Sequence, residues 1–169
     1  MRKTTTTVIV MTMLLLSANR LSAQGKTGCI SFNELLASMP EVKQSDTALA
    51  QYQGALQQQF EDYKAEYSDQ FKLLSSPDTA KYSKAQLEVK RKALSDIYVK
   101  LQGYNEEASQ LIDQKRQALL APIQKKAADA IQAVAKENGY GFIVEKDALH
   151  AYPPSEDILP LVKKKLGLR

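Results

Sequence analysis

The side chains that most often catalyse reactions or bind metals are scarce in this sequence of 169 residues, which has one Cys and one His. A single imidazole excludes multi-histidine metal centres, and a single thiol excludes Cys-rich zinc sites and a disulfide framework within the chain. Cys29 falls in a predicted strand and is expected to be a small buried hydrophobe. His150 is expected to be structural or exposed. Neither residue indicates catalysis.

Recognisable catalytic motifs are also missing from the sequence. It contains no G-x-S-x-G, P-loop, G-x-G-x-x-G, H-E-x-x-H or C-x-x-C. Carboxylate pairs such as Glu61-Asp62 and Glu106-Glu107 fall on charged helix faces, where solvation is the default interpretation. We therefore expect no catalytic, cofactor-binding or metal site, and we do not expect an enzyme.

Aromatic residues are the first feature that stands out. Six of the eight tyrosines, together with Phe60 and Phe71, fall in a predicted long helical hairpin, residues 42–120. A two-helix hairpin has one internal seam, so it cannot bury every ring. Phe60, Tyr63 and Tyr104 are expected to pack in that seam. The candidates for contact with another chain are Tyr52, Tyr67, Phe71, Tyr82 and Tyr98.

Charge along the same segment is the second feature. Residues 42–75 carry a net charge of −2, whereas residues 76–92 carry +3. A solvated helix face explains most runs of this kind. The alternative is contact with an acidic partner, either an unfolded acidic protein or anionic lipid headgroups. The end of the hairpin that contains residues 76–92 is called here the basic arm end. Its basic residues are Lys81, Lys84, Lys90, Arg91 and Lys92.

Periodicity predicts the helices that position these residues. Leu49, Phe60 and Phe71 are 11 apart in a proline-free stretch, which indicates a nearly straight helix over residues 42–74. A break follows at residues 75–79, with the tip of the hairpin near 75–80, and a seven-residue periodicity then predicts the return helix. Folding the chain back at Pro77-Asp78 places Phe60 opposite Ile97.

Gly54 and Gly103 fall at the same height on the two predicted helices. A glycine inside a helix is about 1 kcal/mol less favourable than alanine. Two interpretations stay open: the glycines form a hinge, or they allow close packing of the two backbones.

The flanking residues predict a small body, which makes the fold class α+β: a long antiparallel, coiled-coil-like hairpin projecting from a few short strands. Body residues are 24–41 and 121–169. A sheet this small is not expected to be stable alone, so we expect oligomerisation. The expected elements are a strand at 28–32, a short helix capped by Asn33 and interrupted by Pro40, a helix after Pro122 that stops at Asn138-Gly139, strands at 142–144 and 148–152, and a last helix capped by Asp157 and closed by Gly167.

Residues 1–23 have the layout of a secretory signal peptide. A basic start precedes the apolar run 8–16, and small residues lead to Ala23, after which cleavage is expected. The apolar run is shorter than the roughly 20 residues of a spanning helix. Because the segment holds three basic residues and no acid, its removal lowers the net charge from +4 to +1. The basicity therefore does not favour a nucleic-acid partner, and none is expected.

The segments around the hairpin occur in a recognisable order. They are Gly28-Cys29-Ile30-Ser31-Phe32-Asn33-Glu34-Leu35-Leu36, Met39-Pro40-Glu41, Ile123-Gln124, Glu137-Asn138-Gly139-Tyr140, Phe142-Ile143-Val144, Ser155-Glu156-Asp157-Ile158 and Leu161-Val162-Lys163-Lys164-Lys165-Leu166-Gly167. This order resembles the Skp (OmpH-type) family of periplasmic chaperones over essentially the whole mature chain.

The resemblance implies a homotrimer whose strands form a central body and whose hairpins surround a cavity. It implies an ATP-independent periplasmic holdase, without cofactors, that keeps unfolded outer-membrane β-barrel proteins soluble. Basic arm ends are typical of the family, and this chain matches them in character rather than by a motif. The mature charge of only +1 argues against strong electrostatic capture. A structural coiled-coil scaffold of the envelope, without clients, is the alternative from another class.

Overall fold

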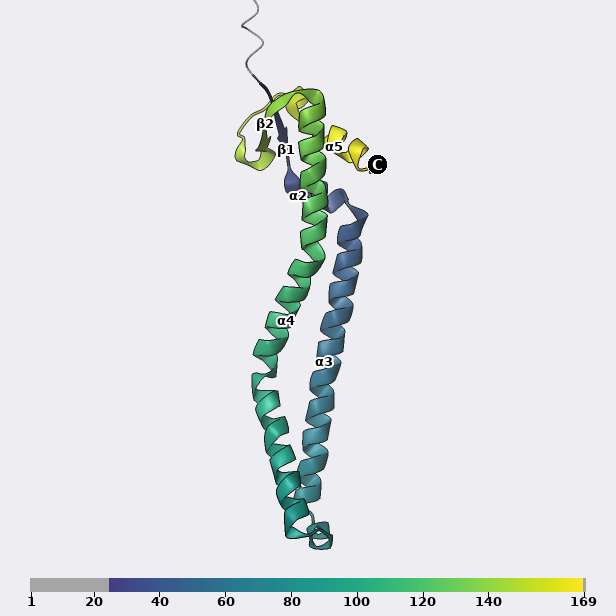
Figure 1. Ribbon diagram of the computed structural model, residues 1–169, viewed down its shortest axis with the longest axis vertical. Helices are drawn as coiled ribbons and strands as arrows, with labels where there is room; N and C mark the ends of the chain where they lie inside the picture. The colour runs from purple at the N-terminus through teal and green to yellow at the C-terminus, as the bar shows by residue number, and fades with distance from the viewer. Residues whose placement is uncertain (1–24, 169) are drawn as a thin grey trace, which may run out of the picture. The chain divides into compact units, whose positions relative to one another are not determined.

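The computed structural model describes residues 25–168, which fold into two compact units. The predicted signal peptide lies outside the described residues. Residues 40–123 form one unit, called here the hairpin unit. Residues 25–39 and 124–168 form the other, called the body unit. Figure 1 labels the elements of both units.

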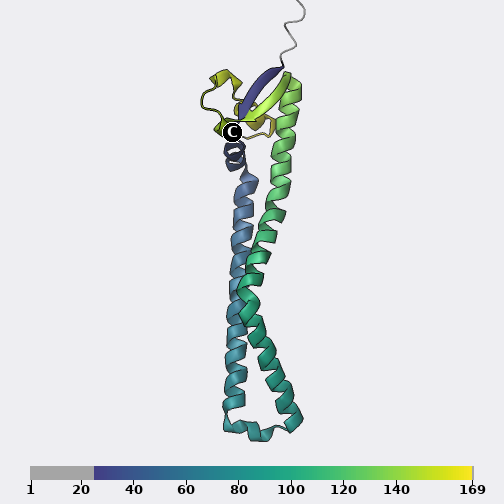
Figure 2. The same ribbon diagram turned by 90° about the vertical axis from the view of Figure 1, so that its left-hand side faces the viewer.

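The hairpin unit contains two long helices that lie side by side (Figures 1 and 2). Helix α3 spans Pro40–Ser75, the 3-10 turn η2 spans Pro77–Lys81, and helix α4 begins at Lys84. Ser83 and Gln86 form a capping box: Ser83 N–H donates to Gln86 Oε1 at 2.9 Å, and Gln86 N–H donates to Ser83 Oγ at 3.3 Å. The predicted hairpin and its break are confirmed.

Helix α4 runs from Lys84 to Asn138, so it continues past Pro122 into the body unit. The prediction that a separate helix follows Pro122 is wrong. Proline removes one backbone hydrogen bond, but Ala127, Ala130 and Val134 are buried at helical spacing just beyond it. That burial favours an uninterrupted helix. The helix ends as predicted, because Gly139 has a φ of 71°.

Two parallel strands, β1 (Lys26–Ile30) and β2 (Tyr140–Glu145), form the sheet of the body unit. A parallel pair needs a crossover connection, and here the connection is the whole hairpin. The strand predicted at 148–152 is wrong: a 3-10 turn, η3 (Lys146–Ala148), and a loop occupy this region. Asp157 forms an isolated bridge with Cys29, so the open side of β1 already has a partner.

Two short helices complete the body unit and contact each other. Helix α2 spans Phe32–Ser38, and α5 spans Leu159–Lys165. Ser31 rather than the predicted Asn33 caps α2, because β1 ends at Ile30 and the Ser31 hydroxyl accepts from Glu34 N–H at 3.3 Å. Ile158 rather than the predicted Asp157 is the N-cap residue of α5, because the helix begins at Leu159, but Asp157 Oδ1 still accepts from the Leu159 N–H at 2.9 Å. The largest fully buried side chains are Cys29, Leu35, Met39, Ile158 and Val162.

The segment after β2 is tied down by an ion pair. Lys146 Nζ lies 2.9 Å from Asp157 Oδ2, and both side chains are largely buried. Burial raises the pKa of the Asp157 carboxyl, but hydrogen bonds from Lys146 and from the Leu159 N–H outweigh it, so this pKa lies below its usual value. The hydrogen bond to Asp157 raises the pKa of Lys146. The pair stays charged over the ordinary pH range.

Candidate functional site

The residues with the greatest chemical reactivity take structural or solvated positions. Cys29 is buried, and burial raises the pKa of its thiol, as expected for a small hydrophobe in a strand. His150 is exposed. Glu61 is exposed and pairs with Lys64 at 3.0 Å on one helix face. Within residues 25–168, no three His, Cys, Asp or Glu side chains gather as metal ligands would.

The seam of the hairpin is built around Tyr104. Its ring centroid lies 5.3 Å from that of Phe60 and 5.9 Å from that of Tyr63. Its hydroxyl donates to the Leu56 carbonyl at 2.7 Å, and burial raises its pKa. The seam role predicted for these three rings is confirmed. Their register is not the predicted one, in which Phe60 faces Ile97, because α4 begins only at Lys84 and the fold-back is later than Pro77-Asp78.

Three of the five predicted contact residues come together where α3 and α4 meet, and they stay partly exposed. Tyr67 stacks on Phe71, with ring centroids 6.2 Å apart and planes at 16°, and contacts Tyr98 at 6.0 Å. Phe71 is 52% exposed and Tyr98 is 49% exposed. These three rings are called the aromatic patch. The three rings pack against one another, yet the Phe71 and Tyr98 side chains remain about half exposed to solvent.

A groove adjoins the aromatic patch. Its open volume is about 390 Å³, and Tyr67 and Tyr98 form part of its wall. The other lining residues, all from α4, are Arg91, Leu94 and Ser95. A guanidinium and aromatic rings therefore border the same space.

The other two predicted contact residues lie against cations. Lys115 Nζ is 5.6 Å from the centre of the Tyr52 ring, and Lys90 Nζ is 5.0 Å from that of Tyr82. Such cation–π contacts at exposed sites contribute about 0.5–1 kcal/mol. Lysine side chains of the same chain therefore partly cover Tyr52 and Tyr82.

The basic arm end combines charge with apolar surface. Lys81, Lys84, Arg91 and Lys92 are exposed, whereas Lys90 is half-buried. Val89 lies among them, is itself well exposed, and borders an open pocket of about 350 Å³. Lys92 forms a 3.6 Å pair with Asp96, which is exposed and therefore weak. This end of the hairpin presents both cations and an apolar side chain.

The space around the two helix glycines decides between their two interpretations. A Cβ added at Gly54 or at Gly103 would meet no heavy atom within 4 Å. Close packing of the two backbones therefore does not require glycine at either position. The prediction that the two glycines fall at the same height is wrong, because Phe60 lies at the level of Tyr104 rather than Ile97, which offsets Gly54 from Gly103 by about two helical turns. The hinge interpretation stays a proposal for each helix separately.

Two exposed surfaces of the body unit were not assigned a function from the sequence. On β2, Phe142 is 74% exposed and Val144 is 39% exposed, and both side chains point to one face. Their spacing of two residues in a predicted strand is the signal that could have revealed this face. Since β1 is the only strand paired with β2 in residues 25–168, the other edge of β2 is open.

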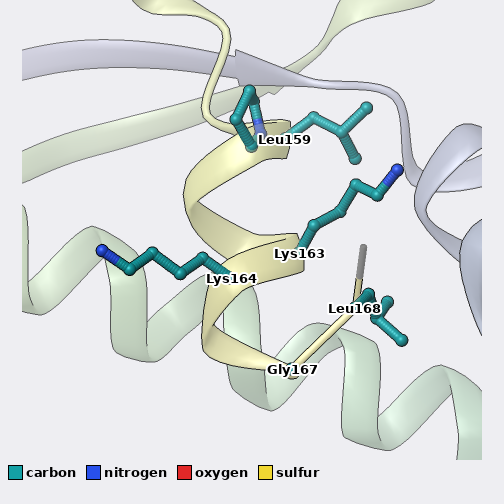
Figure 3. A pocket seen from close by; sticks show the side chains of 6 residues that line it. Leu159, Lys163, Lys164, Gly167 and Leu168 are labelled. Carbon is teal, nitrogen blue, oxygen red and sulfur yellow. The ribbon is translucent and has the colours of Figure 1, made fainter.

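The second surface surrounds α5. An open pocket of about 560 Å³ is bordered by Leu159, Pro160, Lys163, Lys164, Gly167 and Leu168. Figure 3 shows the Lys163 and Lys164 side chains leaving the helix in different directions. The two ammonium groups therefore do not converge on one point, so they do not form a joint binding site for an anion in this pocket. Across residues 25–168, every helix is too short or too polar to cross a bilayer.

Comparison with known proteins gives two findings. Residues 26–166 match the model of a family described as "Outer membrane protein (OmpH-like)". The chain is also similar to a solved structure from Caulobacter crescentus CB15, described as an OmpH-like outer membrane chaperone, with 16% identity, a TM-score of 0.66 and 85% of each chain covered. At this identity the likeness shows the fold, and it confirms the predicted fold class. No curated protein matches the sequence.

Proposed function

The chain belongs to the OmpH-like outer membrane protein family, and on that premise we propose that it is an ATP-independent holdase chaperone of the periplasm. Its clients are unfolded outer-membrane β-barrel proteins. The observation that carries the proposal is the half-exposed aromatic patch of Tyr67, Phe71 and Tyr98 on a long hairpin. An apolar surface kept open on a polar helical arm is suited to binding other chains.

The hairpin geometry suits weak, extended binding. Helix α3 has 36 residues, which is about 54 Å at 1.5 Å per residue. An unfolded chain lying along such an arm makes many separate contacts, each weak enough to break thermally. Release therefore needs no nucleotide. Rings contact apolar client residues, and the cations of the basic arm end contact acidic ones.

Self-association is part of the proposal. The body unit leaves Phe142 and Val144 exposed beside the open edge of β2, and its fully buried core is small. A second copy would cover that apolar face and supply hydrogen-bond partners for the edge. We take the number of copies, three, from the family resemblance. Native mass spectrometry of the mature protein tests it, and a Phe142→Glu variant should shift the mass towards the monomer.

Export and lipid contact complete the proposal. Cleavage after Ala23 places the mature chain in the periplasm, and the intact mass of protein purified from cells tests this site. The basic arm end, with Val89 exposed among its cations, is the surface that would meet anionic lipid headgroups.

A light-scattering experiment tests the holdase role. An unfolded β-barrel protein is diluted from urea with a molar excess of the mature protein and no ATP, and aggregation should be suppressed. Replacing the three rings of the aromatic patch with Ser should weaken suppression. Val99→Ser is the matched control, because Val99 is an exposed apolar residue of α4 outside the patch. The rival scaffold function predicts no suppression even with the unaltered chain.

A further inference from the structure

We propose that the groove beside the aromatic patch selects client segments in which an aromatic residue and a carboxylate lie two positions apart. The groove, called here the aromatic–arginine groove, is lined by Tyr67, Arg91, Leu94, Ser95 and Tyr98. This inference rests on the proposed holdase function and adds a sequence preference to it.

The apolar part of the groove is one end of a ring cluster. On α4, Arg91, Leu94 and Tyr98 are three and four residues apart, so they share one face of the helix. Tyr67 of α3 contacts Tyr98 across the seam, with ring centroids 6.0 Å apart. A client ring placed between Leu94 and Tyr98 would extend this cluster. Arg91 lies one helical turn away.

Arg91 supplies the charge that a carboxylate would meet. Of the acids on this part of the hairpin, Asp96 pairs with Lys92 at 3.6 Å and Asp69 pairs with Lys72 at 3.8 Å, whereas Glu88, three residues before Arg91 on α4, is exposed. Among the side chains that the structure describes, none forms an ion pair with Arg91. Residues 76–92 carry a net +3, which also favours an anion. A planar guanidinium binds carboxylates in two-pronged geometry, which an ammonium cannot reproduce.

The distance between Arg91 and the apolar wall of the groove determines how far apart the ring and the carboxylate of the client segment must be. In an extended chain, side chains two positions apart point to the same face and lie about 7 Å apart. One turn of α4, from Arg91 to the level of Leu94 and Ser95, is about 5.4 Å. A segment lying along α4 can therefore place its ring on the apolar wall and its carboxylate at Arg91. The same alternation is that of a β-strand, the element that barrel proteins contain in number.

Fluorescence of short peptides provides the test, because the chain contains no Trp and every indole signal comes from the probe. Three unstructured Ser/Thr peptides carry one Trp followed two positions later by Glu, Gln or Lys. Each is titrated with the full mature protein. The Glu peptide should bind about fivefold more tightly than the Gln peptide, and the Lys peptide should bind most weakly.

Two variants assign the preference to the groove. Arg91→Gln should abolish the difference between the Glu and Gln peptides. Lys92→Gln removes the same charge from the neighbouring position, where the ammonium already faces Asp96, and should keep the difference. Arg91 and Lys92 are both exposed, so neither change should reduce helicity, which circular dichroism checks.

Equal binding of the Glu and Gln peptides to the unaltered protein would overturn the inference. Loss of the preference in both variants would also overturn it, since general positive charge would then be responsible. Suppression of β-barrel aggregation is measured in parallel. If suppression persists while the peptides bind equally, the holdase proposal stands and only the sequence preference fails.

Discussion

Replacing both helix glycines with alanine should stiffen the hairpin. A Cβ at Gly54 or Gly103 meets no heavy atom within 4 Å, so alanine introduces no steric cost. Each substitution should stabilise its helix by about 1 kcal/mol through backbone propensity alone. Local opening around each glycine should then become about fivefold rarer.

Hydrogen exchange measured by mass spectrometry checks this at the two levels. Peptides covering residues 50–58 and 99–107 should exchange more slowly in the double variant, whereas peptides from the body unit should not change. Suppression of aggregation should fall most for large clients if arm movement adapts the protein to client size. Exchange rates unchanged within twofold at both levels would refute the hinge reasoning, because glycine would then not limit the local stability of the helices.

Three further predictions concern stability. Tyr104→Phe should destabilise the hairpin by about 1 kcal/mol in urea, because it removes a buried hydrogen bond, whereas Tyr98→Phe, at an exposed ring, should change stability by less than about 0.5 kcal/mol. Gly28→Ala should destabilise the body unit by about 1–3 kcal/mol, since its Cβ would lie 2.9 Å from a side-chain methyl carbon; a neutral result by thermal unfolding would contradict that packing. The folded-state pKa of Asp157 lies below the unfolded value, so its stabilisation is present above about pH 4 and is lost as the pH falls through the folded pKa. Asp157→Asn should reduce the fall in the free energy of unfolding at acid pH. If that fall is unchanged, the pair with Lys146 does not contribute to stability.

Local sequence signals predicted the hairpin because helical periodicity and capping act within a few residues. The 11-residue spacing that includes Phe60 and Phe71 fixes one helix face whatever the rest of the chain does. Register depends instead on the length of the turn. A 3-10 turn and a capping box at Ser83 delay the return helix, which moves Tyr104 to the level where Ile97 was expected.

Long-range pairing was harder to predict. Residues 148–152 have strand-like composition, yet the 3-10 turn at Lys146–Ala148 and the loop after it leave them outside the sheet. Strand formation depends on pairing with a partner, which local composition does not specify. The exposure of Phe71 and Tyr98 follows from simple geometry, since one seam cannot bury every ring. The groove at Arg91 could not be predicted, because it depends on which helix face meets Tyr67 across the seam.

The parallel pairing of β1 with β2 has a consequence for the order in which the molecule folds. At the start of α2, the Phe32 N–H donates to the carboxylate of Glu145, the last residue of β2 and a partner 113 residues later in the chain. A coil of that length closes slowly, because its ends must meet by diffusion against a large loss of entropy. Once α3 and α4 pair, starting from the turn between them, the chain that separates β1 from β2 is already folded back and the remaining loop to close is short. The body should therefore assemble after the arm, and β1, although it is synthesised before the hairpin, should be among the last segments to become protected.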